Sequence, residues 1–200
     1  MDKRFLEFAS RIFKYPSTGL GNSLRELEAY CAEKIPSLAG KVSAAIREAD
    51  KFTPAELEEI YADLFYIKPL VSLDLGYQLF GDERKRVEFL LHVKGLQQRH
   101  SVDCGTELPD SLPNVLTLLT RMEAGEDRDE LVGMALAPAL AEILSVMTKA
   151  KREKDARENG TKDHEKRRSK GIPVYLPLTE LLAEYVKSAA TGTAGVKAGG

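Results

Sequence analysis

Residues 53–65 read Thr53-Pro54-Ala55-Glu56-Leu57-Glu58-Glu59-Ile60-Tyr61-Ala62-Asp63-Leu64-Phe65. The first four carry a helix start signal. Thr caps helix N-termini, Pro suits the first helical position, and Glu three residues after the cap completes a capping box. The stretch therefore predicts a helix from Pro54 to about Phe65. Helix signals of this kind decide the fold class of the whole chain.

Apolar residues recur at helical spacing on both sides of this stretch. Phe5, Phe8, Ala9, Ile12 and Phe13 fall on one helix face. Comparable patterns predict further helices over about 22–35, 38–50, 72–80, 82–94, 112–122, 127–148 and 178–190. No stretch shows the sustained two-residue alternation of a strand followed by hairpin turn chemistry. The predicted fold class is all-α, as a single globular helical bundle.

Three local details accompany these helices. In the helix over 72–80, Leu73, Tyr77 and Phe80 are expected to point inward. Asp82 is expected to cap the helix that follows. Pro138 lies inside the helix that starts near residue 127 and is expected to kink it, because proline lacks an amide hydrogen.

One domain is expected over residues 1–190. Within it, residues 149–171 are dense in both charge signs and nearly free of apolar side chains, so we expect a solvated helix end followed by a mobile segment. Residues 191–200 are rich in Gly, Ala and Thr and are expected to form a disordered tail.

Composition narrows the possible functions. Hydrophobic residues make up 43% of the chain and charged residues 30%, with a net charge of -2, which gives no general attraction to nucleic acid. The basic cluster Lys166-Arg167-Arg168 has no interleaved aromatic residue, so we interpret it as solvated linker. The first residues lack a secretory signal, and we expect the longest apolar runs to fall far short of the roughly 20 residues that span a membrane. We expect a cytoplasmic protein.

Signals for catalysis or metal binding are weak. Cys31 and Cys104 stand far apart and outside any paired motif, so we expect two idle thiols and no metal site with His100. Glu107 and Asp110 form a close carboxylate pair. Such a pair suits acid–base work in an enzyme, but it equally suits capping of the helix near residue 112. We expect no catalytic residue and no enzymatic activity.

Several short segments resemble one family. They are Phe13-Lys14-Tyr15-Pro16, Tyr61-Ala62-Asp63-Leu64-Phe65, Ser72-Leu73, Gly76-Tyr77-Gln78-Leu79-Phe80-Gly81 and Glu107-Leu108-Pro109-Asp110-Ser111-Leu112-Pro113. Their order and spacing resemble the TorD/DmsD/NarJ family of redox-enzyme maturation chaperones, over roughly residues 5–150. The NarJ branch, also called the nitrate reductase delta subunit, is the most similar. The family carries a Y-x-x-L-F type motif and, before a later helix, an E-L-P-D-H-L-P type motif.

The resemblance implies a TorD-like helical chaperone without a stably bound cofactor. Such a chaperone binds the N-terminal peptide of a molybdoenzyme catalytic subunit, similar to that of nitrate reductase. It holds the subunit until bis-molybdopterin guanine dinucleotide is inserted. Ser111 stands where the family has His, and a hydroxyl cannot act as a proton-sensitive switch near neutral pH.

A peptide-binding surface of this kind needs apolar walls, together with carboxylates if the peptide carries arginines. The candidate residues are Tyr61, Asp63, Phe65, Asp74, Tyr77, Glu107, Asp110 and Ser111. Two alternatives to the chaperone function stay open. One is a generic helical interaction scaffold, and the other is a small helical enzyme that uses Glu107 and Asp110. A monomer and a dimer that exchanges helices through residues 149–171 are both compatible with the sequence.

Overall fold

The computed structural model describes residues 1–16, 19–156 and 163–190, and within them it contains helices and no β-strand. The all-α prediction is thereby confirmed. The elements in chain order are α1 (Lys3–Ile12), α2 (Leu20–Lys34), α3 (Pro36–Ala49), α4 (Pro54–Phe65), α5 (Leu75–Phe80), α6 (Arg84–Arg99), α7 (Leu112–Arg121), α8 (Glu126–Glu130), the π-helix η1 (Leu131–Leu136), α9 (Ala137–Ala156) and α10 (Asp163–Ala190).

Helix α4 begins where its capping box predicts. The Thr53 hydroxyl accepts a hydrogen bond from the Glu56 amide at 3.3 Å, and Glu56 Oε2 accepts one from the Thr53 amide at 2.8 Å. The two bonds satisfy amides that the first helical turn leaves without partners. The start of α4 is therefore fixed, and with it the direction in which its aromatic residues point.

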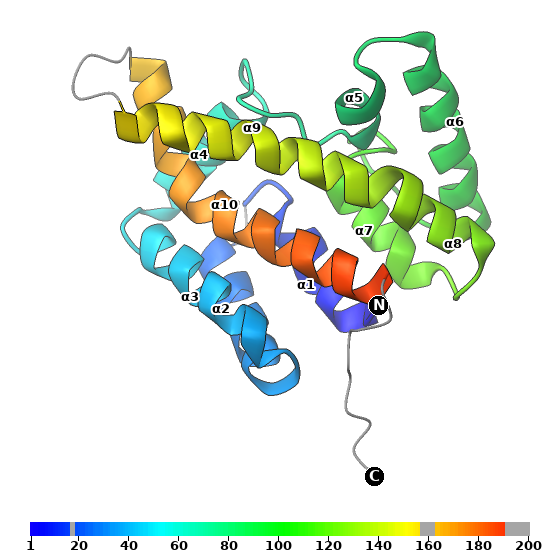
Figure 1. The fold of residues 1–200 in the computed structure, drawn as a ribbon, viewed down its shortest axis with the longest axis horizontal. Coiled ribbons are helices and arrows are strands. Elements are labelled where there is room, and N and C mark those ends of the chain that lie inside the picture. Colours follow the sequence, from blue (N-terminus) through cyan, green and yellow to red (C-terminus); the bar gives the residue numbers. More distant parts are fainter. Residues whose placement is uncertain (17–18, 157–162, 191–200) are drawn as a thin grey trace.

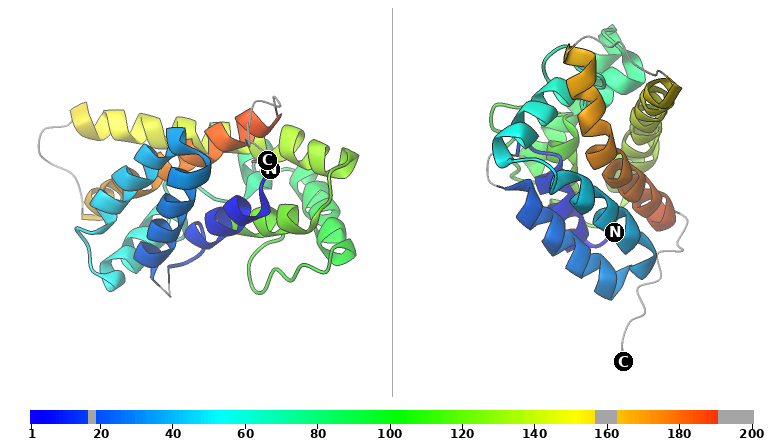
Figure 2. Two further views of the ribbon diagram at one scale, coloured as in Figure 1. Left: turned by 90° about the horizontal axis from the view of Figure 1, so that it is seen from below. Right: turned by 90° about the vertical axis from the view of Figure 1, so that its left-hand side faces the viewer.

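The long helices α9 and α10 pack against each other and cross the molecule together (Figure 1). Helix α10 also packs on α3 and α4, while α1 packs on α2 and α7. Seen edge on, α9 lies along one side of the molecule, with α1 and α7 on the other (Figure 2). Helices α5 and α6 stand together at one end, away from α2 and α3 (Figure 1). One continuous apolar core runs through these layers.

Helix α5 is shorter than predicted, and this changes which side chains face inward. It begins at Leu75, so Leu75 and Gly76 are buried while Tyr77 is 44% exposed. The inward prediction for Tyr77 is wrong, and Phe80 is only partly buried. Leu73 is buried, but it lies in the extended segment before the helix.

The cap of α6 also differs from the prediction. Glu83 is the N-cap residue and its side chain makes no capping bond. Asp82 instead accepts a hydrogen bond from Arg86 Nη1 at 3.2 Å. The carboxylate one residue before the cap thus pairs with a cation on the first turn of the helix.

Helix α10 starts much earlier than residue 178. It includes residues 163–171, for which a mobile segment was predicted, and it runs through Pro173 and Pro177. Each proline removes one helical hydrogen bond, but the surrounding residues are buried in the core, and tertiary packing overrides the local preference. The predicted mobility of residues 157–162 and the predicted disorder of residues 191–200 lie outside the described residues.

A π-helix stands where a kink was predicted. In η1 the Ala137 amide bonds to the Val132 carbonyl five residues earlier, and Pro138 follows in the first turn of α9. A π-helical turn is wider than an α-helical one and shifts the hydrogen-bond register, which accommodates a residue without an amide hydrogen.

The stretch Glu126–Glu153 is long and apolar enough to cross a membrane by length and composition, with a mean hydropathy of 1.8 over its most apolar window. The prediction that no run approaches this length is wrong. Of that window, 44% is buried inside the protein. A helix packed into a core needs the same composition, so the finding is weak support for a membrane span.

Candidate functional site

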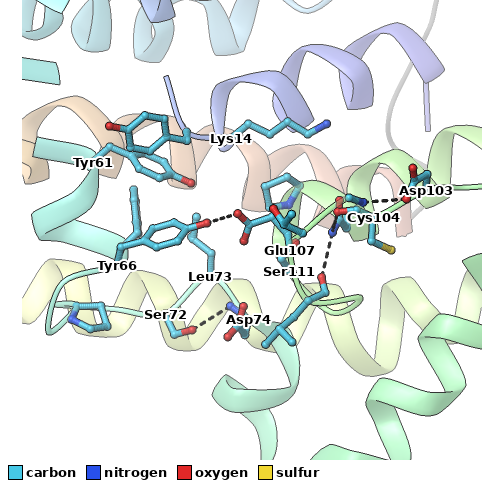
Figure 3. A pocket seen from close by; sticks show the side chains of 18 residues that line it. Lys14, Tyr61, Tyr66, Ser72, Leu73, Asp74, Asp103, Cys104, Glu107 and Ser111 are labelled. Atoms are coloured by element: carbon cyan, nitrogen blue, oxygen red, sulfur yellow. Dashed lines mark hydrogen bonds between the residues drawn. The ribbon is translucent and has the colours of Figure 1, made fainter. Parts of the chain in front are cut away.

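A cavity of about 770 Å³ lies between the C-terminal end of α4 and the loop that precedes α7 (Figure 3). Pockets of this size hold small ligands or a few side chains of a peptide. Five of the eight residues predicted as site residues line it, namely Tyr61, Phe65, Asp74, Glu107 and Ser111. The fold thus brings together two segments that are distant in the sequence.

Helix α4 supplies an aromatic wall. Tyr61 is 2% exposed, and its hydroxyl donates a hydrogen bond to the Phe13 carbonyl at 2.7 Å. Its ring packs edge-on against Phe65 and Tyr15, with centroid distances of 5.0 and 5.7 Å. Burial raises the pKa of Tyr61, so the phenol stays neutral. Tyr61 is therefore held in place as part of the cavity wall, and its hydroxyl already has a hydrogen-bond partner.

Tyr66, the C-cap residue of α4, reaches across the cavity. Its hydroxyl donates a hydrogen bond to Oε1 of Glu107 (Figure 3). Burial and this bond raise the pKa of Tyr66, so the proton remains on the phenol. Both side chains are exposed to the cavity opening, which leaves the second carboxylate oxygen of Glu107 available to a ligand.

Asp74 is the acidic group on the side wall. Its amide bonds to the Ser72 hydroxyl at 3.0 Å (Figure 3), and its Oδ2 lies 3.1 Å from Arg86 Nη2. Burial raises the pKa of Asp74, while the charge of Arg86 opposes that rise. Asp74 is therefore a partly buried carboxylate whose charge depends on a neighbouring guanidinium.

Asp110 does not line the cavity and is fully buried. Its Oδ2 accepts a hydrogen bond from the Gly76 amide at 2.9 Å, and its carbonyl accepts one from the Leu75 amide at 2.9 Å. Asp110 thus holds the first turn of α5 and does not cap α7. Burial raises its pKa. Glu107 therefore lies in the cavity, whereas Asp110 lies behind the cavity wall.

Ser111 is the N-cap residue of α7, but its side chain makes no capping bond. The residue is 4% exposed and lines the cavity, and its hydroxyl has no hydrogen-bond partner among the described residues. It pairs by backbone with Asp74 in an isolated antiparallel bridge. A ligand or a water molecule in the cavity can supply the missing bond.

Asp63 and Tyr77 are not part of the cavity lining. Asp63 lies on the buried side of α4, at 5% exposure. Tyr77 points to the surface, with the Arg86 guanidinium 5.4 Å from its ring centre. Both residues belong to family-like segments and were predicted as a carboxylate and an aromatic contact for a peptide, but neighbouring residues on a helix point in different directions.

Sequence reasoning did not single out Tyr66, Arg86, Gln97 or Asn114. Gln97 Nε2 donates to the Pro109 carbonyl at 2.8 Å, and Asn114 Nδ2 donates to the Leu108 carbonyl at 3.0 Å. These side-chain amides hold the loop before α7 in place. The burial of Gln97 next to Leu96 carries no sequence signal, because only the fold reveals the carbonyl that its side chain meets.

Cys104 lines the cavity as well, and its thiol donates to Gln97 Oε1 at 2.8 Å. Burial raises its pKa, which keeps the thiol protonated and a poor metal ligand or nucleophile. Within residues 1–16, 19–156 and 163–190, no group of three or more His, Cys, Asp or Glu side chains is placed to hold a metal ion.

No family model matches the chain. No curated protein matches it either. The fold and cavity define an all-α protein with an aromatic and acidic pocket.

Proposed function

We propose that the protein is a cytoplasmic chaperone that binds the N-terminal peptide of a molybdoenzyme catalytic subunit, of the nitrate reductase type, during cofactor insertion. One observation carries the proposal. The two segments that most resemble the NarJ branch, Tyr61–Phe65 and Glu107–Pro113, form opposite sides of one cavity. The hydrogen bond from Tyr66 to Glu107 joins these sides across 41 residues of sequence.

The cavity lining suits a peptide that carries a basic side chain. Aromatic rings provide apolar contact and favour a guanidinium stacked on their faces. Asp74, Asp103 and Glu107 supply negative charge, and Lys14 is the cation among the lining residues. An arginine that enters this pocket gains charge-assisted hydrogen bonds as well as aromatic contact.

No stably bound cofactor is part of the proposal. The bis-molybdopterin guanine dinucleotide is inserted into the client subunit, and the contribution of this chain is to hold that subunit's N-terminal peptide in the meantime. The chain acts as a monomer or as a dimer that exchanges helices. A generic helical scaffold would make less specific contacts and would not depend on the cavity.

Isothermal titration calorimetry against the N-terminal peptide of the molybdoenzyme catalytic subunit from the same organism tests this function. We expect saturable binding that weakens in Glu107→Ala. Glu142→Ala, on the exposed side of α9 and outside the cavity, is the matched control and should bind as the wild type does. Absence of binding by the wild type, or equal binding by Glu107→Ala, would contradict the proposal.

A further inference from the structure

Arg86, on the first turn of α6, holds together several groups next to the cavity. Its Nη2 lies 3.1 Å from Asp74 Oδ2, and its Nη1 lies 3.2 Å from Asp82 Oδ1. Its guanidinium also lies over the Tyr77 ring, 5.4 Å from the centre. The side chain is only 18% exposed, and its buried Nε has no hydrogen-bond partner among the described residues. The guanidinium is thus incompletely satisfied where it stands.

Asp74 has two sides. It lines the cavity (Figure 3), whereas Arg86 is not among the lining residues and so reaches Asp74 from behind the wall. The carboxylate therefore has an internal cation at its back and open space at its front. A ligand cation can approach Asp74 without colliding with Arg86, but it must share the negative charge.

Asp110 offers Arg86 a second partner. It is fully buried, and its Oδ1 has no hydrogen-bond partner among the described residues. A Cβ built on Gly76 would lie 2.7 Å from Asp110 Oδ2 and 3.2 Å from Arg86 Cγ. The carboxylate of Asp110 and the stem of Arg86 therefore flank the same glycine, which brings Asp110 within reach of a change in the Arg86 side-chain torsions.

We propose that Asp74 is the cavity's subsite for a cationic side chain, a guanidinium or an ammonium, and that Arg86 sets its affinity by moving toward Asp110 when the ligand cation arrives. The inference deepens the proposed function and rests on it. In the empty state one guanidinium serves Asp74. In the occupied state the ligand pairs with Asp74 and Arg86 pairs with Asp110, so each carboxylate has its own cation.

The charges around Asp74 favour one added cation. Arg86 faces it from α6, Tyr61 and Tyr66 face it from α4, and Glu107 and Asp110 face it from the loop before α7. The two tyrosines are neutral, so Asp74, Glu107 and Asp110 share one guanidinium, which also pairs with the exposed Asp82. Burial raises the pKa of Asp74, and Arg86 opposes the rise. Without Arg86 the pKa of Asp74 rises further, so this carboxyl group is protonated over a wider pH range. A cationic ligand that binds there must then displace the proton.

The test uses N-acetyl-arginine amide as the probe, titrated into the wild type and Arg86→Gln with binding followed by NMR. At about pH 8, where carboxyl groups are ionised even when moderately perturbed, we expect Arg86→Gln to bind about tenfold more tightly, because the ligand no longer competes with an internal cation. Its affinity should also fall more steeply on acidification. An unchanged or weaker affinity at this pH would overturn the inference.

Matched variants separate the effect from general destabilisation. Asp82→Asn removes the exposed partner of Arg86 and should leave probe binding unchanged, because Asp82 is 84% exposed and solvent screens its charge. Asp74→Asn should not bind the probe. Because Arg86 is unchanged in this variant, the result does not depend on whether an Arg86 variant folds. Retained binding in Asp74→Asn would refute the subsite. The uncharged isostere N-acetyl-citrulline amide should bind the wild type and Arg86→Gln equally weakly.

The client peptide distinguishes the two proposals. Probe binding that follows this pattern while the client N-terminal peptide does not bind supports the cation subsite and rejects the chaperone function. Binding of the client peptide that is unaffected by Asp74→Asn supports the chaperone function and rejects the subsite.

Discussion

The hydroxyl of Tyr66 donates a hydrogen bond to Glu107 Oε1 and so joins the end of α4 to the loop before α7. This bond closes one side of the cavity between two segments that are 41 residues apart. It also orients the carboxylate, because one oxygen is held by the phenol. The pairing gives the cavity an acidic group in a defined position on an otherwise exposed loop.

Separate variants distinguish the charge of Glu107 from its hydrogen bond. Glu107→Gln keeps an acceptor for Tyr66 but removes the charge, so we expect the affinity for a basic client peptide to fall about tenfold. Tyr66→Phe keeps the charge and loses only its orientation, so the expected loss is about two- to fivefold. Calorimetry measures both. Equal affinity of Glu107→Gln and the wild type would exclude a role for this charge.

Gly76 is required by the close approach of Asp110. A Cβ at this position would lie 2.7 Å from Asp110 Oδ2, so Gly76→Ala should lower the free energy of unfolding by about 1–3 kcal/mol. Gly40, on α3, has no atom within 4 Å of such a Cβ. Gly40→Ala should therefore raise the free energy of unfolding by about 0.5–1 kcal/mol, because alanine favours a helix more than glycine does. Urea unfolding measures the free energy of unfolding of both variants. A change of the same sign in both would contradict this view of Gly76.

The N-caps of α4 and α7 should differ in strength. Thr53→Ala removes a capping box and should cost about 1 kcal/mol of unfolding free energy. Ser111→Ala removes a hydroxyl that makes no capping bond, so the change should stay within about 0.5 kcal/mol. Thermal unfolding of both proteins provides the comparison. A larger loss in Ser111→Ala would reveal a partner for its hydroxyl.

Much of the fold was predictable because its determinants are local. The cap at Thr53 and the apolar face that includes Phe5 and Ile12 require only neighbouring residues, and both predicted helices are confirmed. The first half of α10 was not predictable. Its prolines oppose a helix locally, and the packing that stabilises them comes from α3, α4 and α9.

The candidate site was predictable only in part. Tyr61 and Glu107 belong to segments with a family resemblance, and both line the cavity. Asp110, from the second of these segments, and Tyr77, from another family-like segment, do not line the cavity, because a motif identifies a stretch of chain without fixing the direction of each side chain. Arg86 was not predictable, since its role depends on carboxylates from two other parts of the chain.

The buried carboxyls should make stability depend on pH. Burial raises the pKa of Asp74 and Asp110 in the folded state. The folded protein then binds protons more tightly than the unfolded chain, whose aspartates titrate near about 3.9. Their contribution is full below that value and is lost as the pH rises through the folded-state pKa.

Asp110→Asn removes one of these titrations and keeps an amide oxygen that can accept from the Gly76 amide. We therefore expect the free energy of unfolding of the wild type to fall more steeply with rising pH, in the mildly acidic range, than that of Asp110→Asn. Urea unfolding at a series of pH values measures both slopes. Identical slopes would show that Asp110 does not retain its proton on folding.

The molybdenum content of the client enzyme tests the chaperone proposal most directly. Metal analysis is performed on the catalytic subunit purified from cells that lack this protein, and from the same cells supplied with the wild type or Glu107→Gln. We predict low molybdenum without the protein, full restoration by the wild type and partial restoration by Glu107→Gln. A full molybdenum content in cells that lack the protein would contradict the proposed function.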